Sequence, residues 1–418
     1  MSSPWGRATA LVCVSCGRSY GPGEANETCA VCGLDGILDV RYDYEAAGRL
    51  LTREGLAANP DRSQWRYLPL LPLAPEAPRP LLPVGWTPII EAPALARHFG
   101  LRSVAIKDEG QNPTGSLKDR ASAVGAARAA HAGRREITCA STGNAASSLA
   151  GQAAQLGLQA YIFLPARASE SKLAQMLIYG ATVFTVRGGY EDAFRLSMDA
   201  ARRFGWYNRN SAVNPVLVEG KKTAGLEIAE QTGGEPPDAV VVPVGDGCTI
   251  AGIHKGLREA ERLGLSRRTP RVIGVQAAGA APIEQAFRAN RPVTPGPAAT
   301  VADGIAVGTP RNWRKAIAAV RESGGSVIAV SDEEILEAMP LLARRTGIWG
   351  EPAAVAGLAA LPALLARGLI SRDERILLVV TGSGLKDIPG ALRAAGRAIE
   401  IDPAIEALAA HLPAGTAS

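Results

Sequence analysis

Aromatic side chains are scarce in this chain of 418 residues, at 5% of the composition, whereas hydrophobic residues make up 47%. A core built mainly from Ala, Leu and Gly favours close packing of helices on a sheet over a β-sandwich. No apolar run reaches the length of a membrane span, and the first residues lack the continuous apolar segment of a signal peptide. We therefore expect a soluble, cytoplasmic protein with sizeable cores and no membrane partner.

Charge and histidine are also limited. The net charge is only +5 and no basic run stands out, so charge gives no reason to expect a nucleic-acid partner. The sequence has neither an HExxH pair nor a GxSxG elbow, which disfavours a catalytic metal and a serine hydrolase. The histidines are His98, His131, His254 and His411.

Four of the six cysteines form two CxxC pairs with twelve residues between them, namely Cys13, Cys16, Cys29 and Cys32. Four thiolates on two tight turns complete a tetrahedral shell, so the spacing favours a closed, structural Zn²⁺ site of the zinc-ribbon type. Two disulfides or four free thiols are the alternatives, and disulfides are disfavoured in a chain without an export signal. A nucleic-acid or partner-binding ribbon is a further alternative, although the knuckle has few basic or aromatic residues.

The length of the chain suggests two or three domains. Residues 70–84 are rich in proline, which predicts an extended connector and no helix. Beyond it, apolar runs typical of strands buried in a parallel sheet alternate with helical patterns, so we expect an α/β fold. The predicted strands are 103–107, 136–139, 160–164, 182–186, 239–244 and 376–380, and the predicted helices are 120–132, 145–156 and 172–179.

Residues 107–120 read KDEGQNPTGSLKDR and place Lys118 where a polar, Gly-rich turn meets a predicted helix. Near the positive N-terminus of a helix the ammonium form is disfavoured, and the neutral amine is the nucleophile that a Schiff base requires. An exposed lysine in a polar loop is the alternative. The composition of the whole segment favours a reactive lysine.

Three Gly-rich loops follow predicted strands, and open α/β sheets bind ligands at the carboxyl ends of their strands. Residues 141–147 read STGNAAS, where backbone N–H groups attract an anion such as a carboxylate, or where Ser, Thr and Asn simply cap a helix. Residues 245–249 read GDGCT, where two glycines let amides approach a phosphate, although Asp246 would repel it unless its side chain turns away. Residues 381–387 read TGSGLKD, for which a plain turn is the alternative. We expect the three loops to converge on one ligand.

These motifs resemble those of threonine synthases, in the same order along nearly the whole chain, although Leu117 replaces the usual Phe. The resemblance implies a fold-type II (tryptophan-synthase β-like) pyridoxal-phosphate enzyme, commonly a dimer, with the cofactor between two α/β domains. A similar Cys-rich knuckle often precedes such domains. On this basis we expect a zinc ribbon-like knuckle at 1–45, a large cofactor-binding domain at 46–115 and 225–418, and a small domain at 116–224.

The resemblance also implies roles for the site residues. Lys118 would hold pyridoxal 5′-phosphate as a Schiff base and then act as the base at Cα, Asn144 would meet the ring 3′-oxygen, and Thr381 would face the pyridine nitrogen. The expected cofactor-binding set is Lys118, Asn144, Gly245, Asp246, Gly247, Cys248, Thr249 and Thr381. The expected substrate-binding set is Lys107, Ser116, Ser141, Thr142, Asn144 and Ala145. The ADG segment at 302–304 and the GEPA segment at 350–353 also resemble family segments, and we assign them no role.

The implied activity is that of a lyase of amino-acid biosynthesis, threonine synthase, which converts O-phospho-L-homoserine and water to L-threonine and phosphate. Residues 165–175 depart from the family pattern, because Glu170 stands where positive charge would help a phosphorylated substrate, although Arg167 and Lys172 remain. A β-eliminating or β-replacing enzyme acting on serine, threonine, phosphoserine or a related amino acid is therefore the alternative. A catalytically silent binding protein is disfavoured by the presence of Lys118, Asn144 and Thr381.

Overall fold

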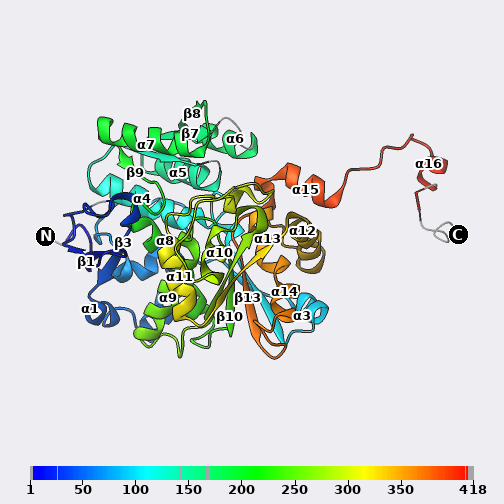
Figure 1. The fold of residues 1–418 in the computed structure, drawn as a ribbon, viewed down its shortest axis with the longest axis horizontal. Helices are drawn as coiled ribbons and strands as arrows, with labels where there is room; N and C mark the ends of the chain where they lie inside the picture. Colours follow the sequence, from blue (N-terminus) through cyan, green and yellow to red (C-terminus); the bar gives the residue numbers. More distant parts are fainter. Residues whose placement is uncertain (1–2, 26, 142, 166–169, 410, 413–418) are drawn as a thin grey trace.

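The structure is a computed structural model that describes residues 3–25, 27–141, 143–165, 170–409 and 411–412. Three sheets organise the chain, and Figure 1 shows the two larger ones as separate layers with helices around them. The C-terminal helix α15 (Ile388–Ala395) packs on the body of the molecule, and the segment after it with α16 (Ile405–Ala409) leaves the body on one side. Within the described ranges, no helix has the length and apolar character needed to cross a membrane.

The largest sheet has six strands in the order β12-β11-β10-β13-β5-β4, and only β4 runs antiparallel to its neighbour. Its strands are β4 (Ile89–Glu91), β5 (Ser103–Asp108), β10 (Ala239–Pro243), β11 (Arg271–Ala277), β12 (Ser326–Val330) and β13 (Arg375–Val380). Alternate residues of β10 enter different cores, since Val241 packs with one face and Val240 with the other. Burial on both faces explains why the strand is a continuous apolar run.

Helices cover both faces of this sheet. One face packs against α3 (Pro93–Phe99), α12 (Asp332–Thr346), α13 (Pro352–Ala359) and α14 (Leu361–Ala366). The other packs against α8 (Val216–Gln231), α9 (Cys248–Arg262), α10 (Pro282–Arg288) and α11 (Trp313–Glu322). This is the layered α/β arrangement expected from the sequence.

The second sheet is wholly parallel, in the order β8-β7-β6-β9, and lies beside the first (Figure 1). Its strands are β6 (Glu136–Ala140), β7 (Gln159–Pro165), β8 (Thr182–Val186) and β9 (Tyr207–Asn208). The helices around it are α4 (Lys118–His131), α5 (Asn144–Gln155), α6 (Glu170–Ile178) and α7 (Tyr190–Phe204). Every strand and helix predicted from the sequence is present, with ends that differ by three residues or fewer.

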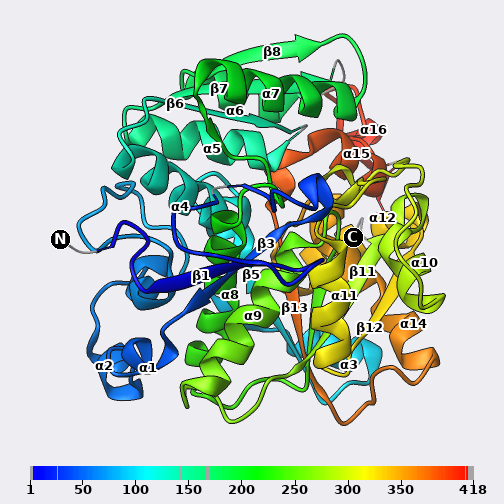
Figure 2. The same ribbon diagram turned by 60° about the vertical axis from the view of Figure 1, so that its left-hand side comes forward.

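The N-terminal module is a small antiparallel sheet of β1 (Ala8–Cys13), β2 (Ser19–Tyr20) and β3 (Leu38–Tyr42), followed by α1 (Tyr44–Gly48) and α2 (Arg53–Ala58). Figure 2 shows β1 and β3 in front of α8, α9 and α11. Partly buried ion pairs join the module to these helices, since Asp39 Oδ1 lies 3.2 Å from Lys255 Nζ and 3.1 Å from Lys315 Nζ. Of the predicted connector at 70–84, Leu70 ends the 3-10 helix Gln64–Leu70, and residues 71–84 form neither a helix nor a strand.

The expected domain boundaries remain a prediction. Both smaller sheets fall inside the ranges expected for the ribbon and the small domain. The expected break between residues 224 and 225, however, falls inside the continuous helix α8 (Val216–Gln231).

Candidate active site

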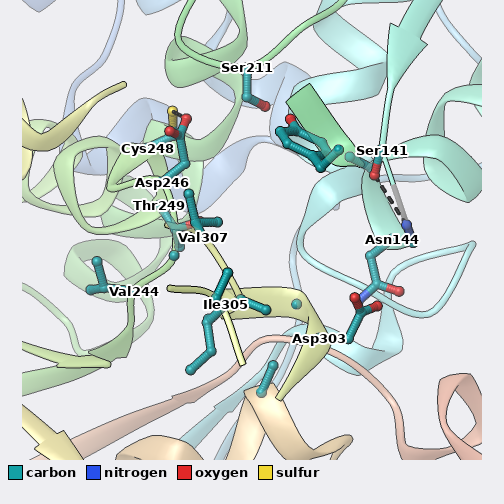
Figure 3. Close-up of a pocket in the computed structure, with 18 of the residues that line it drawn as sticks. Ser141, Asn144, Ser211, Val244, Asp246, Cys248, Thr249, Asp303, Ile305 and Val307 are labelled. Carbon is teal, nitrogen blue, oxygen red and sulfur yellow. Dashed lines mark hydrogen bonds between the residues drawn. The ribbon is translucent and has the colours of Figure 1, made fainter. Parts of the chain in front are cut away.

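A cavity of about 530 Å³ lies at the carboxyl ends of the parallel strands, between the two larger sheets. It brings together Lys118, the loop after β6, the loop after β10 and Thr381 after β13. In Figure 3, Asp246 and Cys248 lie on one side of the cavity, with Ser141 and Asn144 opposite. The convergence of the three predicted loops with Lys118 is therefore present in the fold.

Lys118 is the first residue of α4, as the motif predicts, and its side chain lines the cavity. Enclosure by protein lowers the pKa of its amine to about 8, and the neighbouring cation of Lys221 contributes in the same direction. The turn before it is fixed by Asp119, whose carboxylate accepts hydrogen bonds from the Thr114 backbone N (2.8 Å) and Oγ1 (2.9 Å). Lys118 is therefore accessible from the cavity, and a larger fraction of its amine is neutral than in an exposed lysine. The turn that precedes it is held in place by hydrogen bonds.

Two residues further along α4, Arg120 joins a buried ion network. Its guanidinium donates to both oxygens of Glu109 at 2.7 Å and to both oxygens of Glu227 at 2.6 and 2.7 Å. The Lys107 ammonium group donates to Glu227 (2.9 Å), Gln231 (2.7 Å) and the Thr87 carbonyl (2.6 Å).

The structure does not bring Lys107 or Ser116 to the cavity. All three donors of Lys107 are used inside the network, so it has none left for a ligand. Ser116 is fully buried, and its hydroxyl accepts from the Lys118 backbone N at 3.4 Å. We therefore assign both residues to the support of the Lys118 turn and not to the expected substrate-binding role.

The loop after β6 supplies Ser141, Asn144 and Ala145 to the cavity lining, while Thr142 lies outside the described residues. The Asn144 amide donates to Glu351, and its Oδ1 atom is buried with no hydrogen-bond partner among the described residues. A buried, unsatisfied acceptor at a cavity wall indicates a position that a bound group completes.

The loop after β10 leads directly into α9. Gly247 has φ +89°, a left-handed conformation that favours glycine, and α9 begins at Cys248. Asp246 turns its carboxylate to the Arg311 backbone N (2.6 Å) and to Cys248 Sγ (3.3 Å). The acid that seemed to oppose phosphate binding is thus occupied by donors of the protein, and the loop amides remain beside the cavity.

Several charged residues of the site could not be assigned from the sequence. Asp303 and Glu351 line the cavity, and Lys172 lies 2.9 Å from the first and 3.5 Å from the second. The family-like segments around residues 303 and 351 were the only local signal. Arg209 and Lys221 also line the cavity, and nothing in their local sequence indicates it. Arg167 lies outside the described residues.

Away from this cavity, the thiol groups of Cys13, Cys16, Cys29 and Cys32 all lie within 4.8 Å of one another. A Cβ atom at Gly36 would come within 2.6 Å of the Cβ atoms of Cys29 and Cys32, so only glycine fits at this position against the second CxxC pair. Four sulfur donors in a closed cluster match the ligand set of a structural zinc site.

Comparison with known proteins agrees with this geometry. The family model described as "Pyridoxal-phosphate dependent enzyme" matches residues 81–382. The chain is 41% identical to the threonine synthase of Methanocaldococcus jannaschii over 394 residues, which covers 93% of this chain and 96% of that protein. It is also 41% identical to the threonine synthase of Methanosarcina acetivorans over 380 residues, 90% of this chain and 92% of that protein. Diaminopropionate ammonia lyase from Escherichia coli has the same fold, with a TM-score of 0.65 at 20% identity over 74% of this chain and 87% of that one.

Proposed function

The chain belongs to the pyridoxal-phosphate dependent enzymes, and from this membership we propose that it is a lyase that converts O-phospho-L-homoserine and water to L-threonine and phosphate. The proposed reaction rests on the similarity to two threonine synthases over nine-tenths of the chain or more. The match to the family model, over residues 81–382, includes Lys118, the loops at 141–147 and 245–249, and Thr381.

The residues around the cavity fit pyridoxal 5′-phosphate. Lys118 offers an amine with a lowered pKa, and Asn144 offers a buried oxygen without a partner. The two glycines of residues 245–249 leave no room for a side chain, because a Cβ atom on Gly245 would lie 3.1 Å from Ile305 and one on Gly247 would lie 2.9 Å from Ala316. The loop therefore presents backbone amides and the start of a helix, the usual donors to phosphate.

Each residue then has a proposed task. Lys118 would attach the cofactor, and its amine would accept a proton from the substrate Cα and later return one proton to the substrate. Asn144 and Thr381 orient the cofactor ring, and residues 245–249 hold its phosphate. The bound cofactor supplies the electron sink that makes the substrate Cα–H bond acidic.

The start of α5 is suited to the substrate carboxylate. The free backbone N–H groups of a helix N-terminus attract an anion, and Ser141 and Ala145 line the cavity there. On the same side, Lys172 lies between Asp303 and Glu351 and reduces the repulsion of an anionic substrate by these two acids.

The test is incubation of the purified protein, supplied with pyridoxal 5′-phosphate, with O-phospho-L-homoserine. Phosphate and threonine are expected in equal amounts. Serine and threonine are assayed in parallel for ammonia and 2-oxo acid. Ammonia release without any phosphate release would refute the proposal in favour of β-elimination.

Three further expectations belong to this proposal. The four clustered cysteines hold one structural Zn²⁺, which their spacing and proximity support. A homodimer and a cytoplasmic location rest on the resemblance to threonine synthases. A metal analysis of the purified protein tests the zinc site, and a sedimentation measurement tests the homodimer.

A further inference from the structure

Lys221 is a buried lysine that makes no hydrogen bond or ion pair with any of the residues the structure describes. It lies in the second turn of α8, its exposed fraction is 2%, and it lines the cavity. Its neighbour Lys222 differs, since it lies 2.6 Å from Glu219 and 2.8 Å from Glu259. Protein encloses the rest of this side chain, so a partner for the Lys221 amine would have to lie in the cavity.

Close packing of two helices brings Lys221 to this position. A Cβ atom on Gly225 of α8 would lie 2.1 Å from the Ile253 carbonyl oxygen of α9. In the opposite direction, a Cβ atom on Gly252 of α9 would lie 2.9 Å from the Lys221 Cβ. The two helices therefore touch backbone to backbone, and Lys221 lies beside the first turn of α9, which begins at Cys248.

A lysine beside a helix N-terminus is electrostatically unfavourable, because both are positive. The nearest acid, Asp246, does not compensate by direct contact, since its carboxylate is bound to the Arg311 backbone N and to Cys248. The positive N-terminus of α9 and the Lys221 ammonium group both lie at the cavity, and Asp246, the acid beside them, makes its hydrogen bonds to other groups. A bound anion from outside the chain would compensate the positive charge of both groups.

The other charged residues around the cavity have protein partners. Arg311 pairs with Glu191 at 2.5 Å, and Lys172 is shared by Asp303 and Glu351. Among the lining residues that the structure describes, this leaves Lys118, Arg209 and Lys221 against Asp246 and one acid of the Lys172 pair, a surplus of one positive charge. Within the described part of the chain, the Arg209 guanidinium donates to the hydroxyls of Ser122 and Ser211 and to no carboxylate. The cavity is therefore suited to an anion.

We propose that Lys221 is a phosphate-binding residue, and that its ammonium group and the N-terminus of α9 together bind the phosphate monoester dianion of the cofactor or of the substrate. The proposal rests on the proposed function, because both phosphates belong to it. It adds the charged side chain of Lys221 to a phosphate site that was otherwise attributed to the backbone amides of residues 245–249 alone.

The first experiment measures cofactor binding without turnover. Apoprotein with Lys221→Gln is titrated with pyridoxal 5′-phosphate and, separately, with pyridoxal, and binding is followed by the absorbance of the bound cofactor. Loss of one charge-assisted contact should weaken binding of the phosphorylated form by about 10- to 100-fold and leave pyridoxal within about threefold. Lys315→Gln is the matched control, because Lys315 also lies near α9 but is paired with Asp39 and does not line the cavity.

The second experiment asks whether the substrate phosphate is bound instead. The holoprotein is titrated with O-phospho-L-homoserine and with L-homoserine, and binding is read from the change in the cofactor absorbance spectrum. If Lys221 binds the substrate phosphate, Lys221→Gln weakens only the phosphorylated ligand by about 10- to 100-fold, while the affinity for the cofactor is unchanged. Lys221→Arg, which keeps the charge, should restore most of the affinity in whichever experiment responds. Lys221→Met replaces Lys221→Gln if the latter does not fold.

The proposal is overturned if neither phosphorylated ligand is weakened, or if each is weakened as much as its unphosphorylated counterpart. Failure of the proposed function would give a different experimental result. Wild-type protein would then release no phosphate from O-phospho-L-homoserine, while the comparison of pyridoxal 5′-phosphate with pyridoxal would still report on Lys221.

Discussion

Replacement of Glu227 by glutamine should destabilise the protein more than the loss of any surface ion pair. Glu227 has a fully buried side chain and accepts from Lys107 at 2.9 Å, from Arg120 at 2.6 Å and from the Trp86 backbone N at 2.8 Å. Glu227→Gln keeps the shape but leaves two buried cations with Glu109 as their only remaining carboxylate. Breaking a buried pair in this way costs about 3–5 kcal/mol, since it leaves charge without compensation.

The pKa of Glu227 leads to a similar magnitude. Although burial opposes ionisation, Arg120 and Lys107 lower this pKa from 4.5 to about 2. A carboxyl group with a lowered pKa stabilises the fold above its unfolded pKa, and the stabilisation is lost as the pH falls through the folded pKa. The shift corresponds to about 3 kcal/mol, present near pH 5 and above and lost toward pH 2.

The assay is urea unfolding of wild type and Glu227→Gln near neutral pH, followed by circular dichroism. A loss of about 3 kcal/mol should lower the midpoint of the transition by roughly 1 M. Glu322→Gln is the control, because Glu322 forms an exposed pair with Arg258, worth about 0–1 kcal/mol. Equal midpoints for Glu227→Gln and Glu322→Gln would refute the reasoning, as would a difference from wild type that does not shrink when the pH is lowered toward 3.

Four other outcomes are expected. Lys118→Ala should remove the absorbance of bound cofactor and all turnover while the circular dichroism spectrum is unchanged, and activity within tenfold of wild type would contradict the assignment. The rate of cofactor attachment should rise with pH through a midpoint near 8, because the neutral amine of Lys118 is the reactive form, whereas a midpoint near 10.5 would contradict the lowered pKa. Gly225→Ala should push α8 away from α9, cost about 1–3 kcal/mol in urea unfolding and weaken cofactor binding, and an unchanged midpoint would show that the helices are not in backbone contact. A strong chelator should release one zinc per chain and lower the melting temperature, with no such effect in Cys29→Ser, and a metal-free wild type would exclude the zinc site.

Much of the fold and part of the site could be predicted from local sequence. The strands of the parallel sheet are continuous apolar runs such as residues 239–244, since a strand buried on both faces has no polar side to present. The position of Lys118 at the start of a helix, and the loops that contain Asn144 and Thr381, follow from motifs a few residues long. Such features depend on backbone conformation and on neighbours in the sequence, so the sequence contains them directly.

Lys107 shows where this reasoning fails. Its place in the Lys118 motif suggested a contact with substrate, but it lies on β5, and its side chain points to Glu227 on α8. Which way a strand residue points depends on the register of the whole sheet. The motif alone did not contain that information.

The sequence by itself therefore determined the alternation of strands and helices from residue 103 to residue 186, the place of Lys118 at the start of a helix, the loops around it and the cysteine spacing, because each is encoded over a short stretch of chain. Only the tertiary structure decided what the charged residues of α8 do. Glu219, Lys221 and Glu227 are all buried. The partners of Glu219 lie on β3 and α9 and those of Glu227 on β5 and α4, so the roles of these two acids depend on packing between segments far apart in the chain. That packing places Glu227 between two cations and leaves Lys221 facing the cavity alone.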